Sequence, residues 1–80
     1  MYKNKNGKRN NIVGLKIREL RLAHPDKLSQ KGLADKLQLA GLDLTKNAIQ
    51  RIESGERFVT DIELKYMAEI FQVTPNDLYS

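Results

Sequence analysis

The chain has no cysteine among its 80 residues, and His24 is its only histidine. Without cysteine it can form no disulfide or thiolate zinc site and has no Cys nucleophile. One histidine alone leaves a transition metal without its usual ligands. We therefore expect no metal and no cofactor, and a reducing compartment such as the cytoplasm suits the composition.

Long apolar stretches are also missing. No run approaches the roughly 20 residues that span a bilayer, and the polar, basic start MYKNKNGKRNN lacks the apolar region of a signal peptide. Neither a Ser/His/Asp or Cys/His set nor a glycine-rich phosphate loop is visible. These absences favour a soluble cytoplasmic protein without membrane partners and argue against an enzyme.

Positive charge is present and unevenly placed. The net charge is +4. Residues 1–11 contain four basic residues and no acid, whereas residues 61–80 are acidic on balance. A cationic surface suits phosphate or an anionic membrane, although it can also serve solubility alone. We expect residues 1–10 to form a basic flexible arm, which could follow a phosphate backbone, enter a minor groove or only keep the chain soluble.

Helical periodicity dominates residues 11–80, which we interpret as one domain. Apolar residues recur at spacings of three and four, and strand-like alternation is absent. The fold class is therefore all-α, with five short helices. We expect helices at 12–23, from Ser29 to about 40, between Thr45 and Gly55, from a Thr60–Glu63 capping box to Phe71, and a short one after Thr74.

The helix at about 46–54, from the stretch TKNAIQRIESG, has two different faces. Ala48, Ile49 and Ile52 share one face. The opposite face is a stripe without apolar or acidic residues, consisting of Lys46, Asn47, Gln50, Arg51 and Ser54. Arg and Lys can bond guanine, and Asn and Gln can bracket adenine, in a DNA major groove. A solvated helix face is the alternative interpretation.

The preceding helix begins with Gln30 and Lys31, and the two helices with their turn form a helix–turn–helix unit. The free amides and the positive dipole end of a helix N-terminus favour an anion such as phosphate. We expect a phosphate contact from Gln30. For Lys31, phosphate contact and surface solubility remain open.

Four segments together resemble the Cro/repressor-type, or Xre-type, helix–turn–helix DNA-binding domain. They are IRELR (17–21), LSQKGLADKL (28–37), IQRIESG (49–55) and LKYMAEIFQVTPNDL (64–78). The resemblance implies a five-helix repressor-like fold that binds double-stranded DNA with the second helix of the motif in the major groove. It also implies a bacterial or phage transcriptional regulator, a repressor, that is cytoplasmic and nucleoid-associated.

The resemblance assigns roles residue by residue. Base reading falls on Lys46, Asn47 and Arg51, with Gln50 close by. Phosphate contact falls on Gln30 and, after the recognition helix, on Ser54, Gly55 and Arg57. A structural ion pair is implied between Arg21 of the first helix and Glu53.

Other features leave alternatives open. The 38–44 turn is longer than usual in the family, so either the preceding helix runs on or the loop bulges with Leu42 and Leu44 in the core. We expect Phe58 in the core, with an exposed contact beside DNA as the alternative. A second apolar line on the 60–71 helix packs within the domain or, with the chain end, forms a homodimer interface through Ile62, Tyr66, Ile70, Leu78 and Tyr79.

Two other functions are alternatives to transcriptional regulation. One is a DNA-binding antitoxin that also covers a toxin, and the other is a protein-interaction module on the same fold. An interaction face should carry aromatic or aliphatic anchors, which the polar stripe lacks.

Overall fold

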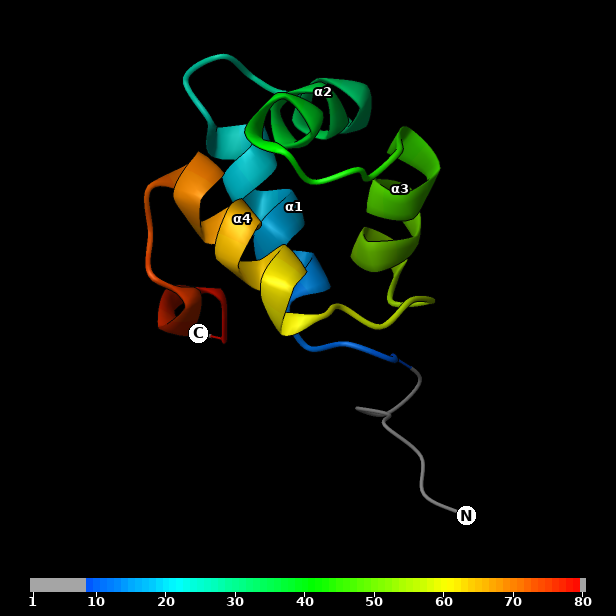
Figure 1. Ribbon diagram of the computed structural model, residues 1–80. Coiled ribbons are helices and arrows are strands. Elements are labelled where there is room, and N and C mark those ends of the chain that lie inside the picture. The colour runs from blue at the N-terminus through cyan, green and yellow to red at the C-terminus, as the bar shows by residue number, and fades with distance from the viewer. Residues whose placement is uncertain (1–8, 80) are drawn as a thin grey trace.

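A computed structural model describes residues 9–79. Its helices are α1 (Gly14–Ala23), α2 (Gln30–Ala40), α3 (Lys46–Ser54) and α4 (Asp61–Phe71), followed by the 3-10 helix η1 (Pro75–Tyr79). Figure 1 shows α4 in front of α1, with α3 on one side of the molecule and η1 on the other. The predicted all-α class is confirmed; of the five short helices expected, four are α-helices and the last is a 3-10 helix.

The last element is a 3-10 helix because it is short and its first turn is closed by local bonds. Pro75 has no amide hydrogen to donate. Thr74 N donates to Asp77 Oδ2 at 2.9 Å, and Asp77 N donates to Thr74 O at 3.0 Å. That i to i+3 bond is the 3-10 pattern, which rarely extends beyond a few residues.

Side-chain caps begin three of the helices where the sequence predicts them. Ser29, Thr45 and Thr60 each accept a hydrogen bond from the backbone amide three residues later, and Glu63 completes the capping box with Thr60. Gly41 ends α2 with φ at 107°, in the left-handed region that a side chain disfavours. Helix α1 instead begins at Gly14, two residues later than expected.

The core lies where all four helices meet. Helix α1 contacts α3, α4 and η1, and α2 contacts α3 and α4. Fully buried large side chains come from every one of these elements: Ile17, Leu33, Leu37, Ile49, Ile52, Met67 and Leu78. Burying one such side chain contributes about 1.5–3 kcal/mol relative to leaving it exposed. Leu78 is thus a core residue, and its prediction as part of a dimer surface is wrong.

The long turn between α2 and α3 folds back onto the core. Leu44 is 5% exposed, and Leu42 is partly buried against the same cluster. Gln38 Nε2 donates to Leu44 O at 2.8 Å, which ties the end of the turn to α2. The bulged alternative is therefore the one that the chain adopts, and it fixes the start of α3.

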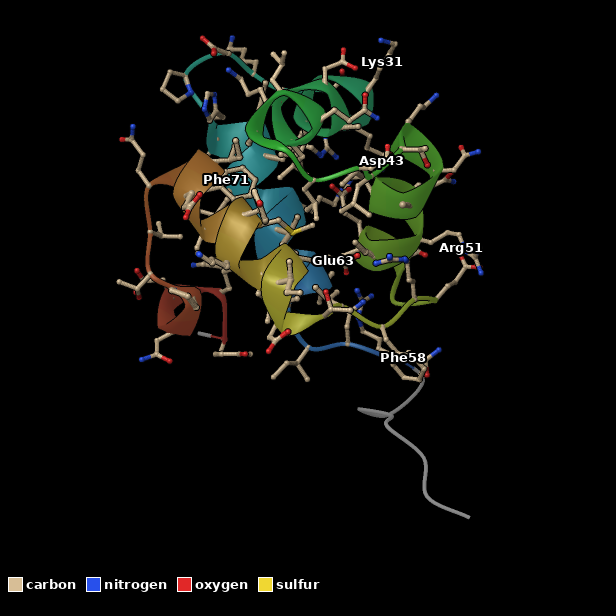
Figure 2. All side chains as sticks on the ribbon, viewed as in Figure 1. Lys31, Asp43, Arg51, Phe58, Glu63 and Phe71 are labelled. Atoms are coloured by element: carbon tan, nitrogen blue, oxygen red, sulfur yellow. The ribbon has the colours of Figure 1, made fainter. Side chains whose placement is uncertain are left out.

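The sequence led us to expect Phe58 in the core, but the structure places it outside the core. It lies in the extended loop between α3 and α4 and is 54% exposed, pointing outward at the lower edge of Figure 2. The neighbouring Val59 packs against the core instead. Successive side chains of an extended segment point to opposite sides, so burial of Val59 turns Phe58 toward solvent.

Candidate nucleic-acid interface

Helix α3 presents its polar stripe outward. Lys46, Asn47, Gln50 and Arg51 are all exposed, whereas Ile49 and Ile52 on the opposite face are fully buried. Figure 2 shows Arg51 pointing away from the rest of the molecule. Within residues 9–79, none of these four side chains makes a hydrogen bond or an ion pair, whereas the fifth stripe residue, Ser54, donates to Glu56 Oε2.

A buried ion pair holds the other side of α3. Arg21 Nε donates to Glu53 Oε2 at 2.7 Å, and Arg21 Nη2 donates to Glu53 Oε1 at 2.9 Å. The two side chains are only 9% and 4% exposed. Arg21 Nη1 also donates to Leu28 O at 2.9 Å. The structure thus brings together the pair that the resemblance implies, and the pair joins α1, the segment before α2 and the end of α3.

Gln30 joins this network from the first turn of α2. Its Nε2 donates to Glu53 Oε1 at 3.1 Å, and the residue is partly exposed. An amide nitrogen carries two hydrogens, so one remains for a ligand outside the domain. Glu53 therefore positions Gln30 as well as Arg21.

Lys31 lies one residue further on and is exposed, at the top of Figure 2. Its Nζ is 3.1 Å from Asp35 Oδ2, one turn along the same helix. An exposed pair of this kind contributes only about 0–1 kcal/mol. Lys31 can therefore exchange Asp35 for a phosphate at little cost.

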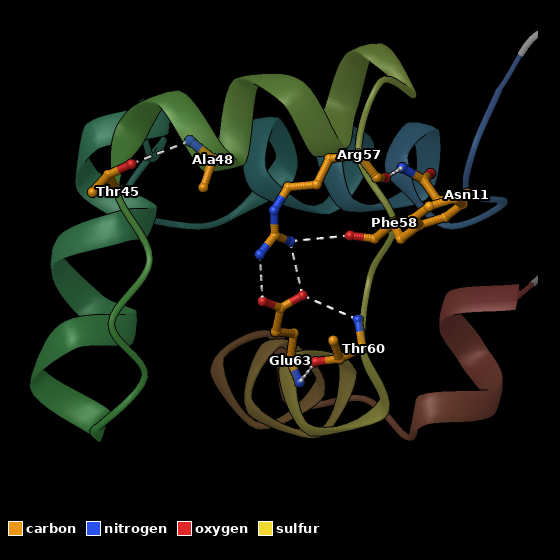
Figure 3. A network of polar contacts seen from close by, with 7 residues as sticks. All are labelled: Asn11, Thr45, Ala48, Arg57, Phe58, Thr60 and Glu63. Carbon is orange, nitrogen blue, oxygen red and sulfur yellow. Dashed lines mark hydrogen bonds and ion pairs between the residues drawn. The ribbon is translucent and has the colours of Figure 1, made fainter.

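The loop after α3 differs most from the sequence expectation. Arg57 donates through both terminal nitrogens to Glu63, at 2.8 and 2.7 Å, and through Nη1 to Phe58 O (Figure 3). These bonds hold the pKa of the Glu63 carboxyl below its usual value, against the opposing effect of burial, and the Thr60 amide adds to the lowering. Arg57 is thus engaged inside the domain.

Two further phosphate candidates are also engaged. Gly55 is buried, and its amide donates to Ile52 O at 3.1 Å in the helix C-cap. Ser54 is exposed, but its hydroxyl donates to Glu56 Oε2 at 2.8 Å. The Gly55 amide, the Ser54 hydroxyl and the Arg57 guanidinium thus all have hydrogen-bond partners within the domain, and of these three residues Ser54 is the most exposed.

Comparison with protein families decides the identity of this arrangement. The sequence profile of the helix-turn-helix family HTH_3 matches residues 17–78. The chain belongs to this helix-turn-helix family. Comparison with curated proteins and with solved structures gave no match.

The family is a DNA-binding one without enzymatic activity, and its Cro/repressor-type members are those that the sequence resembles. DNA is therefore the partner of this helix-turn-helix domain. Within residues 9–79, no helix has both the length and the apolar character needed to cross a membrane.

An N-terminal segment that precedes the family match also contacts the helix-turn-helix unit. Asn11 Nδ2 donates to Ile52 O at 2.9 Å and to Arg57 O at 2.8 Å, and Asn11 Oδ1 accepts from Gly14 N at 2.8 Å. Asn11 is buried, and the last of these bonds gives the first amide of α1 a partner. Asparagine before a helix is a recognisable capping signal, but nothing in the sequence relates Asn11 to carbonyls more than 40 residues away.

Gly14 allows this close approach. A Cβ at Gly14 would come within 2.2 Å of Ile52 O and 2.8 Å of Asn11 Oδ1. The first residue of α1 therefore lies directly against the C-terminal end of α3. Of the predicted basic arm, Lys3, Lys5 and Lys8 lie outside the described residues.

Proposed function

We propose that this chain binds specific double-stranded DNA sequences and regulates transcription as a repressor, with α3 in the major groove. One observation carries the proposal. A helix anchored by buried contacts presents four adjacent hydrogen-bonding side chains that have no partner within residues 9–79. Such a surface suits base edges, whereas an interface for protein would offer apolar anchors.

In the proposed complex, each stripe residue has a chemical counterpart. Arg51 and Lys46 suit guanine O6 and N7, and Asn47 and Gln50 suit adenine N6 and N7. Gln30, Lys31 and Ser54 lie at the two ends of the helix pair and suit the flanking phosphates. A domain of this size would repress most simply by covering a promoter, and its place would be the cytoplasm, on the nucleoid.

We further propose that two copies bind together. Ile62 and Tyr79 are exposed apolar side chains at 61% and 52%, on α4 and η1. Tyr66 and Ile70 are half-buried and contribute less surface. Dimers of such domains place two recognition helices about one DNA turn apart on near-palindromic sites.

Selection of binding sites from random double-stranded DNA tests the proposal, with Arg51→Ala as the comparison. The full chain should enrich a short motif, and Arg51→Ala should lose discrimination at one base position, at a cost of about 1–3 kcal/mol. Arg18→Ala is the matched control, because Arg18 is an exposed arginine on α1. No enrichment even at low salt would refute the proposal, and a uniform loss on all sequences would make Arg51 a phosphate contact.

A further inference from the structure

The side chain of Arg9 lies across the C-terminal end of the recognition helix. Arg9 Nη2 donates to Glu53 O at 2.7 Å. A Cβ on Gly55 would be 2.8 Å from Arg9 Cζ and 2.9 Å from its Cγ and Nε, so the guanidinium and its stem cover this glycine. Gly55 is therefore buried by a side chain from the opposite end of the described chain. A side chain at position 55 would collide with Arg9 in this position.

The backbone beside Arg9 is fixed to the same loop. Asn10 N donates to Gly55 O at 2.7 Å, and Asn10 Nδ2 donates to Glu56 O at 3.0 Å. Together with the Asn11 bonds, these contacts form a strap, residues 9–11, along the end of α3 and the loop that follows. Figure 1 shows this blue segment running beneath the lower end of α3, and Figure 3 shows Asn11 beside the loop. Arg9 thus has a defined position relative to the stripe.

Arg9 differs from Arg57 in its ion pairing. Arg57 is the arginine that the sequence suggests for a phosphate contact after α3. Arg57 is paired with Glu63 through two bonds. No carboxylate within residues 9–79 forms an ion pair with Arg9, which is only half-buried. A guanidinium has five N–H donors, and the described contacts of Arg9 use one nitrogen. At this end of α3, Arg9 therefore has donors and charge left for an external anion, whereas Arg57 is paired with Glu63.

We propose that Arg9 binds a DNA backbone phosphate at the end of the recognition helix. It takes the role that the sequence suggests for Arg57, which is paired with Glu63 instead. The nine residues of α3 span about 13.5 Å, and the major groove is about 12 Å wide. Groups at the ends of a helix inserted there lie near the phosphates that border the groove. Arg9 lies at that end of α3, where it contacts Glu53 and covers Gly55, the two residues that flank the last stripe residue, Ser54. This inference rests on the proposed function and adds a contact from outside the family match.

A purely structural role is the competing explanation. A cation near a helix C-terminus interacts favourably with the dipole, by about 0.3–1 kcal/mol at an exposed site. Such a role would change stability and the position of α3. It would not change the number of counterions that DNA releases. The dependence of affinity on salt therefore separates the two roles, because each neutralised phosphate adds about 0.9 to the slope of log K against log salt.

The test measures binding of the full chain to its selected site and to unrelated duplex DNA over a range of salt concentrations. Arg9→Met keeps the aliphatic stem over Gly55 and removes the charge. We expect it to weaken binding to both DNAs by the same factor and to reduce the salt slope by about 1, and Arg9→Lys to restore most of the slope. Arg57→Met should leave the slope unchanged. Arg18→Met is the control for the loss of one charge elsewhere on the surface.

The outcomes are distinct. An unchanged slope in Arg9→Met, or a loss confined to the selected site, would make Arg9 a structural residue and overturn the inference. A reduced slope in Arg57→Met, with wild-type slope in Arg9→Met, would return the phosphate to Arg57. If the wild-type chain binds neither DNA at low salt, the proposed function itself fails. Circular dichroism of each variant establishes that a slope is measured on folded protein.

Discussion

The buried pair between Arg21 and Glu53 offers the largest single perturbation of this domain. Replacing Glu53 by alanine leaves the Arg21 guanidinium in a site where the arginine side chain is 9% exposed. Two charge-assisted hydrogen bonds disappear, and only the bond to Leu28 O remains. Gln30 loses its partner as well. The variant therefore leaves a buried charge without compensation.

The expected cost follows from this count. Breaking a buried pair by removing one partner costs about 3–5 kcal/mol. A chain of 80 residues has an unfolding free energy of about 4–12 kcal/mol at 0.05–0.15 kcal/mol per residue. Glu53→Ala should thus remove a large share of the stability. Glu53→Gln keeps one acceptor oxygen for Arg21 and should cost about half as much.

Urea unfolding followed by circular dichroism measures the effect. Glu69→Ala is the matched control, because Glu69 is exposed on α4 and forms no ion pair within residues 9–79; it should stay within about 0.5 kcal/mol of wild type. The double variant Arg21→Met with Glu53→Leu should recover most of the loss, since an apolar pair removes the unpaired charge. A cost below 1 kcal/mol for Glu53→Ala, or a double variant no more stable than the single one, would refute the reasoning.

Two more predictions concern acid and assembly. Because its folded-state pKa is lowered, Glu63 contributes stability that is complete above its unfolded pKa of about 4.3 and is lost as pH falls through the folded value. Glu63→Gln should therefore be less stable at pH 7 by about 1–2 kcal/mol and lose less stability on acidification, and parallel pH profiles of unfolding would contradict this. Sedimentation of the full chain with its DNA site should show two copies per duplex, and Ile62→Lys should reduce this to one; a monomer at high micromolar concentration, even with DNA, would exclude the dimer.

Local chemistry explains which parts of the fold could be predicted. A cap needs only residues within one turn, so Thr45 and Gly55 delimit α3 in the structure as they do in the sequence. The capping box before α4 follows from Thr60 and Glu63, which are three residues apart. The apolar face of α3 follows in the same way from its period. These features required no knowledge of the rest of the chain.

The interface was predictable only where one residue type suits one partner. An arginine can pair with a phosphate or with a carboxylate, and the sequence cannot show that Glu63 lies within hydrogen-bond distance of Arg57. The bonds from Asn11 to Ile52 and Arg57 join residues 41 and 46 positions apart, and no local pattern encodes such distances. The Arg21–Glu53 pair joins residues 32 positions apart and was expected only because the chain resembles a known family.

The contacts of α3 explain why its free face can act as a reader of DNA. The start of the helix is fixed by the Thr45 cap and by Leu44, and its end by Glu53 and the strap of residues 9–11. Within residues 9–79, every buried polar side-chain atom has a hydrogen-bond partner. Binding therefore requires little ordering of the helix itself, and ordering is a main cost of association. Only the stripe side chains must lose freedom when they meet the bases, so the interactions that they form are available for affinity and discrimination.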